Sequence, residues 1–167
     1  RIPARSVEHA ESALAKNEKR ATALPPATEM IATADDSQEQ FRESAEQAAE
    51  TATGHVDRIF IQDLGITAAR AKLQSTWSAG VETVYFAGHG NYLYWAVKNL
   101  LHLTDIKNLG TPEMLPLVIQ LDCMSSAAFM LRQYDGYSSI SEALLLTPQK
   151  GAVAVIGSTG MSPPEGQ

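Results

Sequence analysis

Cysteine is nearly absent from this 167-residue chain, which has only Cys123. A single cysteine excludes a disulfide within the chain and therefore leaves the redox compartment open. It also argues against a structural zinc site, because the four histidines lie far apart and none stands at zinc-ligand spacing from the cysteine. We therefore predict no metal site. A lone cysteine is then either a small buried hydrophobic residue or a nucleophile.

Basic clusters and long apolar runs are also missing. The chain has 13 Lys and Arg against 19 Asp and Glu, a net charge of -6, and no cationic cluster that could neutralise nucleic-acid phosphates. No apolar run approaches the roughly 20 residues of a membrane-spanning helix. We therefore predict no nucleic-acid partner and no membrane partner. Because the chain opens at Arg1 rather than Met, we expect a processed piece or an excerpt of a longer protein.

Short apolar runs alternate with helical patterns along the chain. Strands are expected at 30–34, 57–63, 81–90, 117–123 and 151–157. Helices are expected at 6–20, 36–53, 65–79, 92–101, 125–133 and 139–146, and a loop at 104–116. This alternation predicts one α/β domain with a mostly parallel sheet and helices on both faces.

Two of the expected strands stop at a reactive side chain. Val81–Gly90 (VETVYFAGHG) ends with His89 between two glycines, and Leu117–Cys123 (LVIQLDC) ends at the cysteine. The carboxyl ends of parallel strands meet at one edge of a sheet, so we expect the two side chains to lie close together. An imidazole beside a thiol forms a nucleophile and its proton partner.

Other features near these two residues fit the same chemistry. The glycines around His89 leave room and expose the backbone N–H of Gly90 as an oxyanion donor. Cys123 precedes an expected helix whose dipole would favour the thiolate, and Asp122 should point to the opposite face of the strand. Asp35 ends an earlier strand and could orient the imidazole. Structural alternatives stay open: a turn histidine, a core thiol and an acid at a helix N-terminus, where Asp36 and Glu39 suggest a capping box.

Several motifs occur together in a fixed order: RIPAR at Arg1–Arg5, FAGHG at Phe86–Gly90 with Trp95 soon after, the strand ending in Asp122-Cys123, then Phe129, and SEALLLTPQKGAVAVIGSTG at Ser141–Gly160. With these motifs the chain resembles the caspase-like catalytic domain of the gingipain-type cysteine peptidases (family C25, clan CD). The resemblance covers nearly the whole chain. It implies a caspase-like, doubly wound α/β fold, with residues 1–167 forming part of a catalytic domain whose first strands are absent.

The resemblance also implies an activity, that of a cysteine endopeptidase. His89 and Cys123 would form a catalytic dyad that hydrolyses peptide bonds through a thioester acyl-enzyme. Cys123 would attack the scissile carbonyl and His89 would protonate the leaving amine. The backbone N–H groups of Gly90 and Cys123 would stabilise the oxyanion. Asp35 is similar in position to the acid that orients the histidine in this family.

Substrate recognition and cellular setting follow from the same resemblance. Glu39 is the candidate acid for a basic P1 side chain, and Trp95 is a second candidate substrate contact. An aromatic residue that walls the S1 pocket in some relatives is missing near 162–163, which leaves basic specificity open. No cofactor is required, although relatives suggest structural calcium. The expected partners are a peptide or protein substrate and other domains of the same longer chain, and the expected location is extracellular or at the cell surface.

Two other functions fit the sequence. The chain could be a catalytically inactive caspase-like scaffold or binding module with a vestigial dyad, given the truncated cleft and the missing aromatic residue. It could also be a nucleotide-binding doubly wound domain. That second alternative depends on Gly157–Gly160 (GSTG), which lacks the lysine and the spacing of a P-loop.

Overall fold

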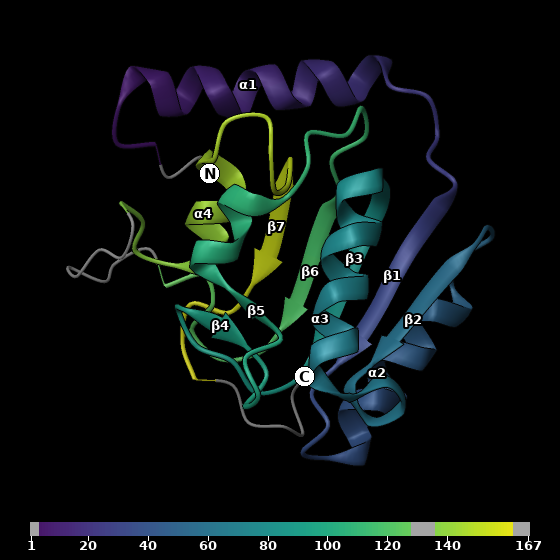
Figure 1. The fold of residues 1–167 in the computed structure, drawn as a ribbon. Coiled ribbons are helices and arrows are strands. Elements are labelled where there is room, and N and C mark those ends of the chain that lie inside the picture. Colours follow the sequence, from purple (N-terminus) through teal and green to yellow (C-terminus); the bar gives the residue numbers. More distant parts are fainter. Residues whose placement is uncertain (1–3, 128–135, 162–167) are drawn as a thin grey trace.

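The computed structural model describes residues 4–127 and 136–161 (Figure 1). Within these residues the elements are, in chain order, α1 (Val7–Thr22), β1 (Thr28–Ala34), α2 (Glu39–Glu50), β2 (Val56–Phe60), α3 (Ile61–Ala79), β3 (Val81–Ala87), β4 (Tyr94–Trp95), β5 (Leu101–His102), the 3-10 helix η1 (Leu103–Asn108), β6 (Leu117–Leu121), α4 (Ile140–Leu146) and β7 (Ala154–Gly157).

A five-stranded parallel sheet with the order β2-β1-β3-β6-β7 organises the fold. The strands are in register at their carboxyl ends, because Ala34 of β1 pairs with both Phe60 and Ala87, and Ala87 pairs in turn with Leu121. Residues that follow these strands therefore emerge along one edge. All five strands expected from the sequence are confirmed, and so is the parallel sheet.

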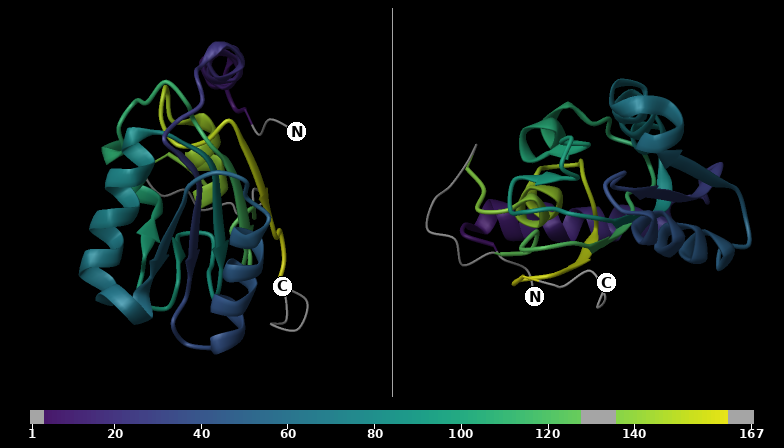
Figure 2. Two further views of the ribbon diagram at one scale, coloured as in Figure 1. Left: turned by 90° about the vertical axis from the view of Figure 1, so that its right-hand side faces the viewer. Right: turned by 90° about the horizontal axis from the view of Figure 1, so that it is seen from below.

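Helices cover both faces of the sheet, and α2 and α3 lie on opposite faces (Figure 2). On the α3 face a large apolar core unites the sheet with α3, α4 and the segment from β4 to η1. On the other face a smaller core joins α2 to the sheet through Phe41, Ala45 and Ala49. Burial of these two sets of side chains supplies the main driving force for folding.

The longest helices follow the sequence patterns with small shifts at their ends. Ser6 caps α1, because its side chain accepts the backbone N–H of His9. Ser139 caps α4 in the same way. Helix α3 begins at Ile61, before the expected start at Gly65. That glycine adopts φ 73° and kinks the helix, which explains why the sequence pattern indicated a start there.

The prediction of a helix at 92–101 is wrong. This segment instead forms the short antiparallel pair β4–β5, in which Tyr94 pairs with His102. The side chains of Trp95, Leu100 and Leu101 are buried from this non-helical backbone. Positive φ angles at Ala96 and Asn99 break any helix there.

The helix expected at 125–133 is not found in its described part. Residues 125–127 form a turn, and residues 128–135, with Phe129 among them, lie outside the described residues. The expected loop at 104–116 begins as the 3-10 helix η1, which ends at Asn108. Among the helices of residues 4–127 and 136–161, none is long and apolar enough to cross a membrane.

Candidate active site

The loops that carry His89 and Cys123 leave adjacent strands at the same level. Ala87, the last residue of β3, pairs with Leu121, the last residue of β6. The backbone N–H of Gly88 continues this pairing by donating to Leu121 O at 3.0 Å. His89 and Cys123 each come two residues after these paired ends, so the sheet brings both to one edge. The closeness of the two side chains themselves stays a prediction.

His89 faces helix α2. Its imidazole meets the Phe41 ring edge-on, with ring centroids 5.1 Å apart and an interplanar angle of 80°. In β6 the even-numbered side chains Val118 and Gln120 are buried towards the α3 face, whereas Leu121 packs against the α2 core. Cys123 comes two residues after Leu121, beyond the end of β6, and it is partly exposed. The imidazole of His89 therefore lies on the α2 side of the sheet, the side that Leu121 also faces.

The Asp35 side chain binds the backbone of the loop that carries His89 and does not contact the imidazole ring. The carboxylate is fully buried and accepts the backbone N–H of Ser37 at 3.2 Å with Oδ1. Its Oδ2 accepts the N–H of His89 at 3.3 Å and that of Val97 at 3.2 Å. Asp35 was expected to orient the imidazole of His89. Its two carboxylate oxygens instead accept three backbone N–H groups, so the residue anchors the loop.

Gln38 is the polar residue that meets the His89 ring, and the sequence analysis missed it. The two Nε2 atoms lie 3.1 Å apart. The sequence had suggested a capping box starting at Asp36, but α2 begins at Glu39, with Gln38 as its N-cap residue. Asp36 pairs with Lys98 instead. The signal for Gln38 was available: a long amide side chain in the turn directly after a strand that ends at the expected site.

Gly90 must lack a side chain because of Asp122. A Cβ at Gly90 would overlap the Asp122 carboxyl group, so the loop after β3 lies directly against the residue before Cys123. Gly90 forms an antiparallel bridge with Trp95 in which the N–H of Asn91 and the N–H of Ala96 are the donors. The N–H of Gly90 has no backbone acceptor within the described part of the chain, as the predicted oxyanion donor requires.

Asp122 is a buried acid of the α3 face. Its side chain is 1% exposed, and neither carboxyl oxygen has a hydrogen-bond partner in residues 4–127 and 136–161. Burial raises the pKa of Asp122 to about 7. Near neutral pH this group is therefore protonated about half of the time, so it carries less negative charge beside the thiol than an ordinary aspartate.

A turn follows Cys123 in place of the expected helix N-terminus. Met124 has φ 57°, a left-handed backbone conformation that residues other than glycine rarely adopt. The turn is held by the segment after β7, because the N–H of Met124 donates to Gly160 O and that of Ser126 to Ser158 O, both at 2.9 Å. The GSTG segment is thus engaged with the loop of Cys123. In the described residues no helix dipole acts on the thiol.

Glu39 and Trp95 occupy very different places. Glu39 is exposed as the first residue of α2, close in sequence to Gln38. Trp95 is fully buried, stacked on Phe86 with centroids 4.7 Å apart, and it donates from Nε1 to Gln120 Oε1 at 2.8 Å. This corrects the expected role of Trp95 as a substrate contact, because a side chain with no exposed surface supports the loop from the core.

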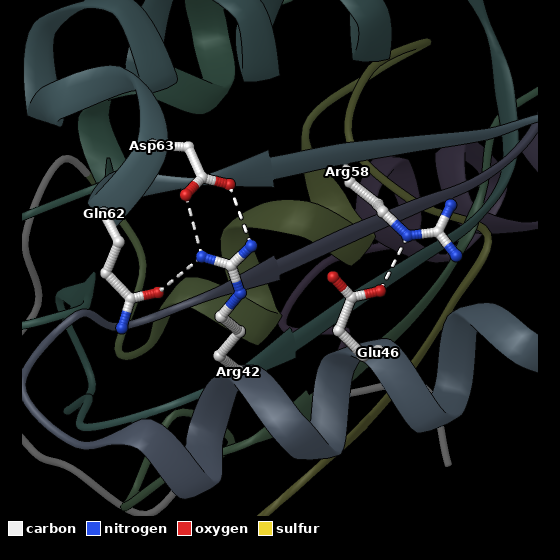
Figure 3. A network of polar contacts seen from close by, with 5 residues as sticks. All are labelled: Arg42, Glu46, Arg58, Gln62 and Asp63. Carbon is white, nitrogen blue, oxygen red and sulfur yellow. Dashed lines mark hydrogen bonds and ion pairs between the residues drawn. The ribbon is translucent and has the colours of Figure 1, made fainter.

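A network of charged side chains braces α2, the helix that faces His89 (Figure 3). Arg42 binds both carboxylate oxygens of Asp63 at 2.8 and 3.0 Å, and its guanidinium lies 4.6 Å from the Phe60 ring centroid. Glu46 accepts from Arg58 Nε at 2.7 Å. The network links α2 to β2 and to the start of α3 at the surface, whereas Phe41 is held by its burial in the core between α2 and the sheet.

Comparison with known proteins identifies the family. The sequence profile described as Peptidase family C25 matches residues 1–167. The chain belongs to peptidase family C25. This is a family of cysteine peptidases, as the sequence resemblance implied. No curated protein sequence matches the C25 chain significantly.

Solved structures confirm the fold of the C25 chain. The arginine-specific cysteine proteinase gingipain R superposes with a TM-score of 0.69 at 18% identity, over 93% of this chain and 38% of that one. A structure described only as a protease gives 0.74 at 20%, over 97% and 36%. The complex of the Porphyromonas gingivalis RgpB pro- and mature domains gives 0.66 at 17%, over 96% and 40%. The chain thus spans about two fifths of the length of each neighbour.

The described residues contain no cluster of metal-binding side chains. In residues 4–127 and 136–161, no group of three or more His, Cys, Asp or Glu side chains is arranged to hold a metal ion. The calcium suggested by the family resemblance stays a prediction.

Proposed function

We propose that this chain carries the catalytic dyad of a cysteine endopeptidase, formed by Cys123 and His89. The observation that supports this most directly is the matched register of β3 and β6, which ends both strands two residues before the dyad at the same edge. Membership of a cysteine peptidase family supports the same reading. The buried Asp35 carboxylate, which anchors the His89 backbone, gives the site the rigidity that such chemistry needs.

The reaction follows from the two side chains. Cys123 Sγ gives its proton to the imidazole of His89 and attacks the scissile carbonyl, forming a tetrahedral oxyanion beside the backbone N–H groups of Gly90 and Cys123. The imidazolium then protonates the departing amine as the carbon–nitrogen bond breaks, which leaves a thioester on Cys123. Water, deprotonated by His89, hydrolyses the thioester and restores the thiol.

Substrate choice and location form the finer part of the proposal. The substrate is a peptide or protein segment, and a basic P1 residue is supported by the exposed acid Glu39 at the start of α2. One structural neighbour is described as arginine-specific. We place the enzyme outside the cell or at its surface, and we expect further domains of the same longer chain to complete the cleft.

An active-site-directed probe tests the dyad. Intact protein is treated at neutral pH with a peptidyl acyloxymethyl ketone, and adduct formation is followed by mass spectrometry with peptide mapping. We expect a single adduct on Cys123, none in Cys123→Ala, and a rate at least about 100-fold lower in His89→Ala, since the thiol then has no proton partner.

The matched control is His55→Ala, which removes an exposed histidine near Asp57 and should label at the wild-type rate. Folded protein that forms no adduct with a panel of P1 residues, arginine and lysine included, would contradict the peptidase proposal. Retained binding of a peptide under those conditions would instead indicate the inactive binding module.

A further inference from the structure

The imidazole of His89 is held from two sides by residues of one helix turn. Gln38 approaches ring atom Nε2, with its own Nε2 at 3.1 Å, and Phe41 meets the ring edge-on. Gln38 is the N-cap residue of α2, and its side chain makes no capping bond there. The amide is therefore directed to the ring and not to the helix end.

Asp35 does not compete for this position. Both of its carboxylate oxygens accept backbone N–H groups, those of Ser37, His89 and Val97. In the described residues the polar contact to the ring comes from an uncharged amide. A carboxylate can bind only a ring N–H, whereas an amide can offer either a donor or an acceptor to the same ring nitrogen.

Gln40 sets the direction of the hydrogen bond between Gln38 and His89. Gln40 Nε2 donates to Gln38 Oε1 at 2.9 Å, which leaves the Gln38 amino group facing His89. The ring nitrogen Nε2 then accepts, and the proton of the neutral imidazole resides on Nδ1. If both amides rotate by 180°, Gln38 Oε1 accepts from a protonated Nε2, and Nδ1 becomes free to take up a proton.

We propose that Gln38 is the positioning residue of His89, and that its amide holds ring atom Nε2 in both tautomers and in the imidazolium. With Nε2 occupied, Nδ1 is the ring nitrogen left for proton exchange. The orientation in the structure corresponds to a resting state. The rotated orientation supports the reactive state, in which Nδ1 receives the thiol proton of Cys123 and passes it to the leaving amine. The catalytic part of this inference rests on the proposed peptidase function.

Nuclear magnetic resonance of the ring nitrogens tests the inference without any need for turnover. Intact protein is labelled with ¹⁵N-histidine, and the His89 signals are assigned by their loss in His89→Asn. We expect the neutral wild-type ring to carry its proton on Nδ1, and Gln38→Leu to shift it toward the Nε2–H form that is usual for free histidine. Gln47→Leu, the same change at an exposed position of α2, should leave the signals unchanged.

Kinetics supply a second readout on the same variants. In Gln38→Leu we expect kcat to fall roughly tenfold at unchanged KM, because the proposed role of Gln38 is in proton transfer by His89 and not in substrate binding. In Gln38→Glu a carboxylate faces the ring and favours its protonated form, so the pH–rate profile should move up by about one pH unit. Gln47→Leu should match the wild type.

The outcomes separate the two proposals. If the His89 signals and the pH–rate profile are the same in Gln38→Leu, Gln38→Glu and the wild type, Gln38 does not position the ring and this inference fails alone. If no variant hydrolyses peptide but the ring signals change as expected, the peptidase proposal fails while the positioning role stands.

Discussion

At the scale of single residues, Asp122 is the group most at odds with its surroundings. It is a buried acid whose oxygens lack hydrogen-bond partners in the described residues, and it lies against Gly90 in the loop of His89. Burial disfavours its charged form, which is why its pKa is raised to about 7. The folded state therefore keeps a proton that the unfolded state releases between pH 4 and 7.

This makes stability fall as the pH rises through that range. The unfolded chain binds fewer protons than the folded chain between the two pKa values, so the free energy of unfolding decreases from about pH 4 to about pH 7. In Asp122→Asn we expect this loss to disappear, with a gain over the wild type that grows to at most roughly 4 kcal/mol above pH 7.

Urea unfolding of both proteins at pH 4.5 and pH 8 measures the effect. If the free energies of unfolding of the variant and the wild type differ by the same amount at both pH values, Asp122 is not the group that stays protonated in the folded state. Asp63→Asn is a suitable comparison, since that carboxylate is half exposed and paired with Arg42.

At the scale of elements, α1 is attached to the domain by the hydrogen bonds and ion pairs of long basic side chains more than by an apolar stripe. Val7 and Leu14 of this helix are exposed, and Ala13 is its buried apolar residue. Lys16 Nζ instead donates to Leu144 O and Leu145 O at the end of α4, at 3.0 and 2.9 Å. Lysine at a helix C-terminus complements its unsatisfied carbonyls and dipole.

Arg5, just before α1, makes the strongest of these attachments. Its guanidinium pairs with Glu142 of α4 at 2.8 and 3.0 Å, and Glu142 is 1% exposed. Replacing Arg5 with Leu leaves that buried carboxylate without its counter-charge, so we expect a loss of about 2–3 kcal/mol of stability. Chemical denaturation at neutral pH measures it.

The Glu142→Gln background supplies the control for this pair. There the partner carries no charge, and Arg5→Leu should cost less than half as much. A cost that is the same in both backgrounds would mean that the ion pair does not hold α1 in place.

At the scale of the whole molecule, two buried ionisable groups lie at opposite ends of the sheet. Helix α1, with Lys16, crosses the end where the strands begin, whereas Asp122 follows the end of β6 (Figure 1). Burial lowers the pKa of Lys16 to about 7. The unfolded chain then binds the extra proton above pH 7, so stability rises from about pH 7 to pH 10.5, opposite in sign to the effect of Asp122.

We therefore expect the two groups together to produce a minimum in stability near pH 7. The variant Lys16→Met should lose the rise above pH 7, and the double variant with Asp122→Asn should lose both slopes additively, since the sites share no partner. Lys16→Met also removes bonds to helix carbonyls, so the measured quantity is the change of stability with pH. Slopes that fail to add would show that the two ends of the sheet are coupled.

The sheet and the residues at its edge could be predicted from the amino-acid sequence. Each buried strand is a short apolar run bounded by polar or glycine residues, and such runs allow few other structures. His89 and Cys123 were predicted side by side because strand ends in a parallel sheet share an edge, a relation that depends on chain order alone. The FAGHG motif, the strand ending in Asp122-Cys123 and the segment 141–160 together predicted the family.

Only the tertiary structure decided which groups contact the imidazole. Helix α2 begins at Glu39, and this start decides that Gln38, and not Asp35, contacts the imidazole. Sequence patterns do not locate a helix end to within one or two residues. The burial of Trp95 and the β4–β5 turn likewise depend on contacts with Phe86 and Gln120 from other strands. Local periodicity carries no information about such distant neighbours.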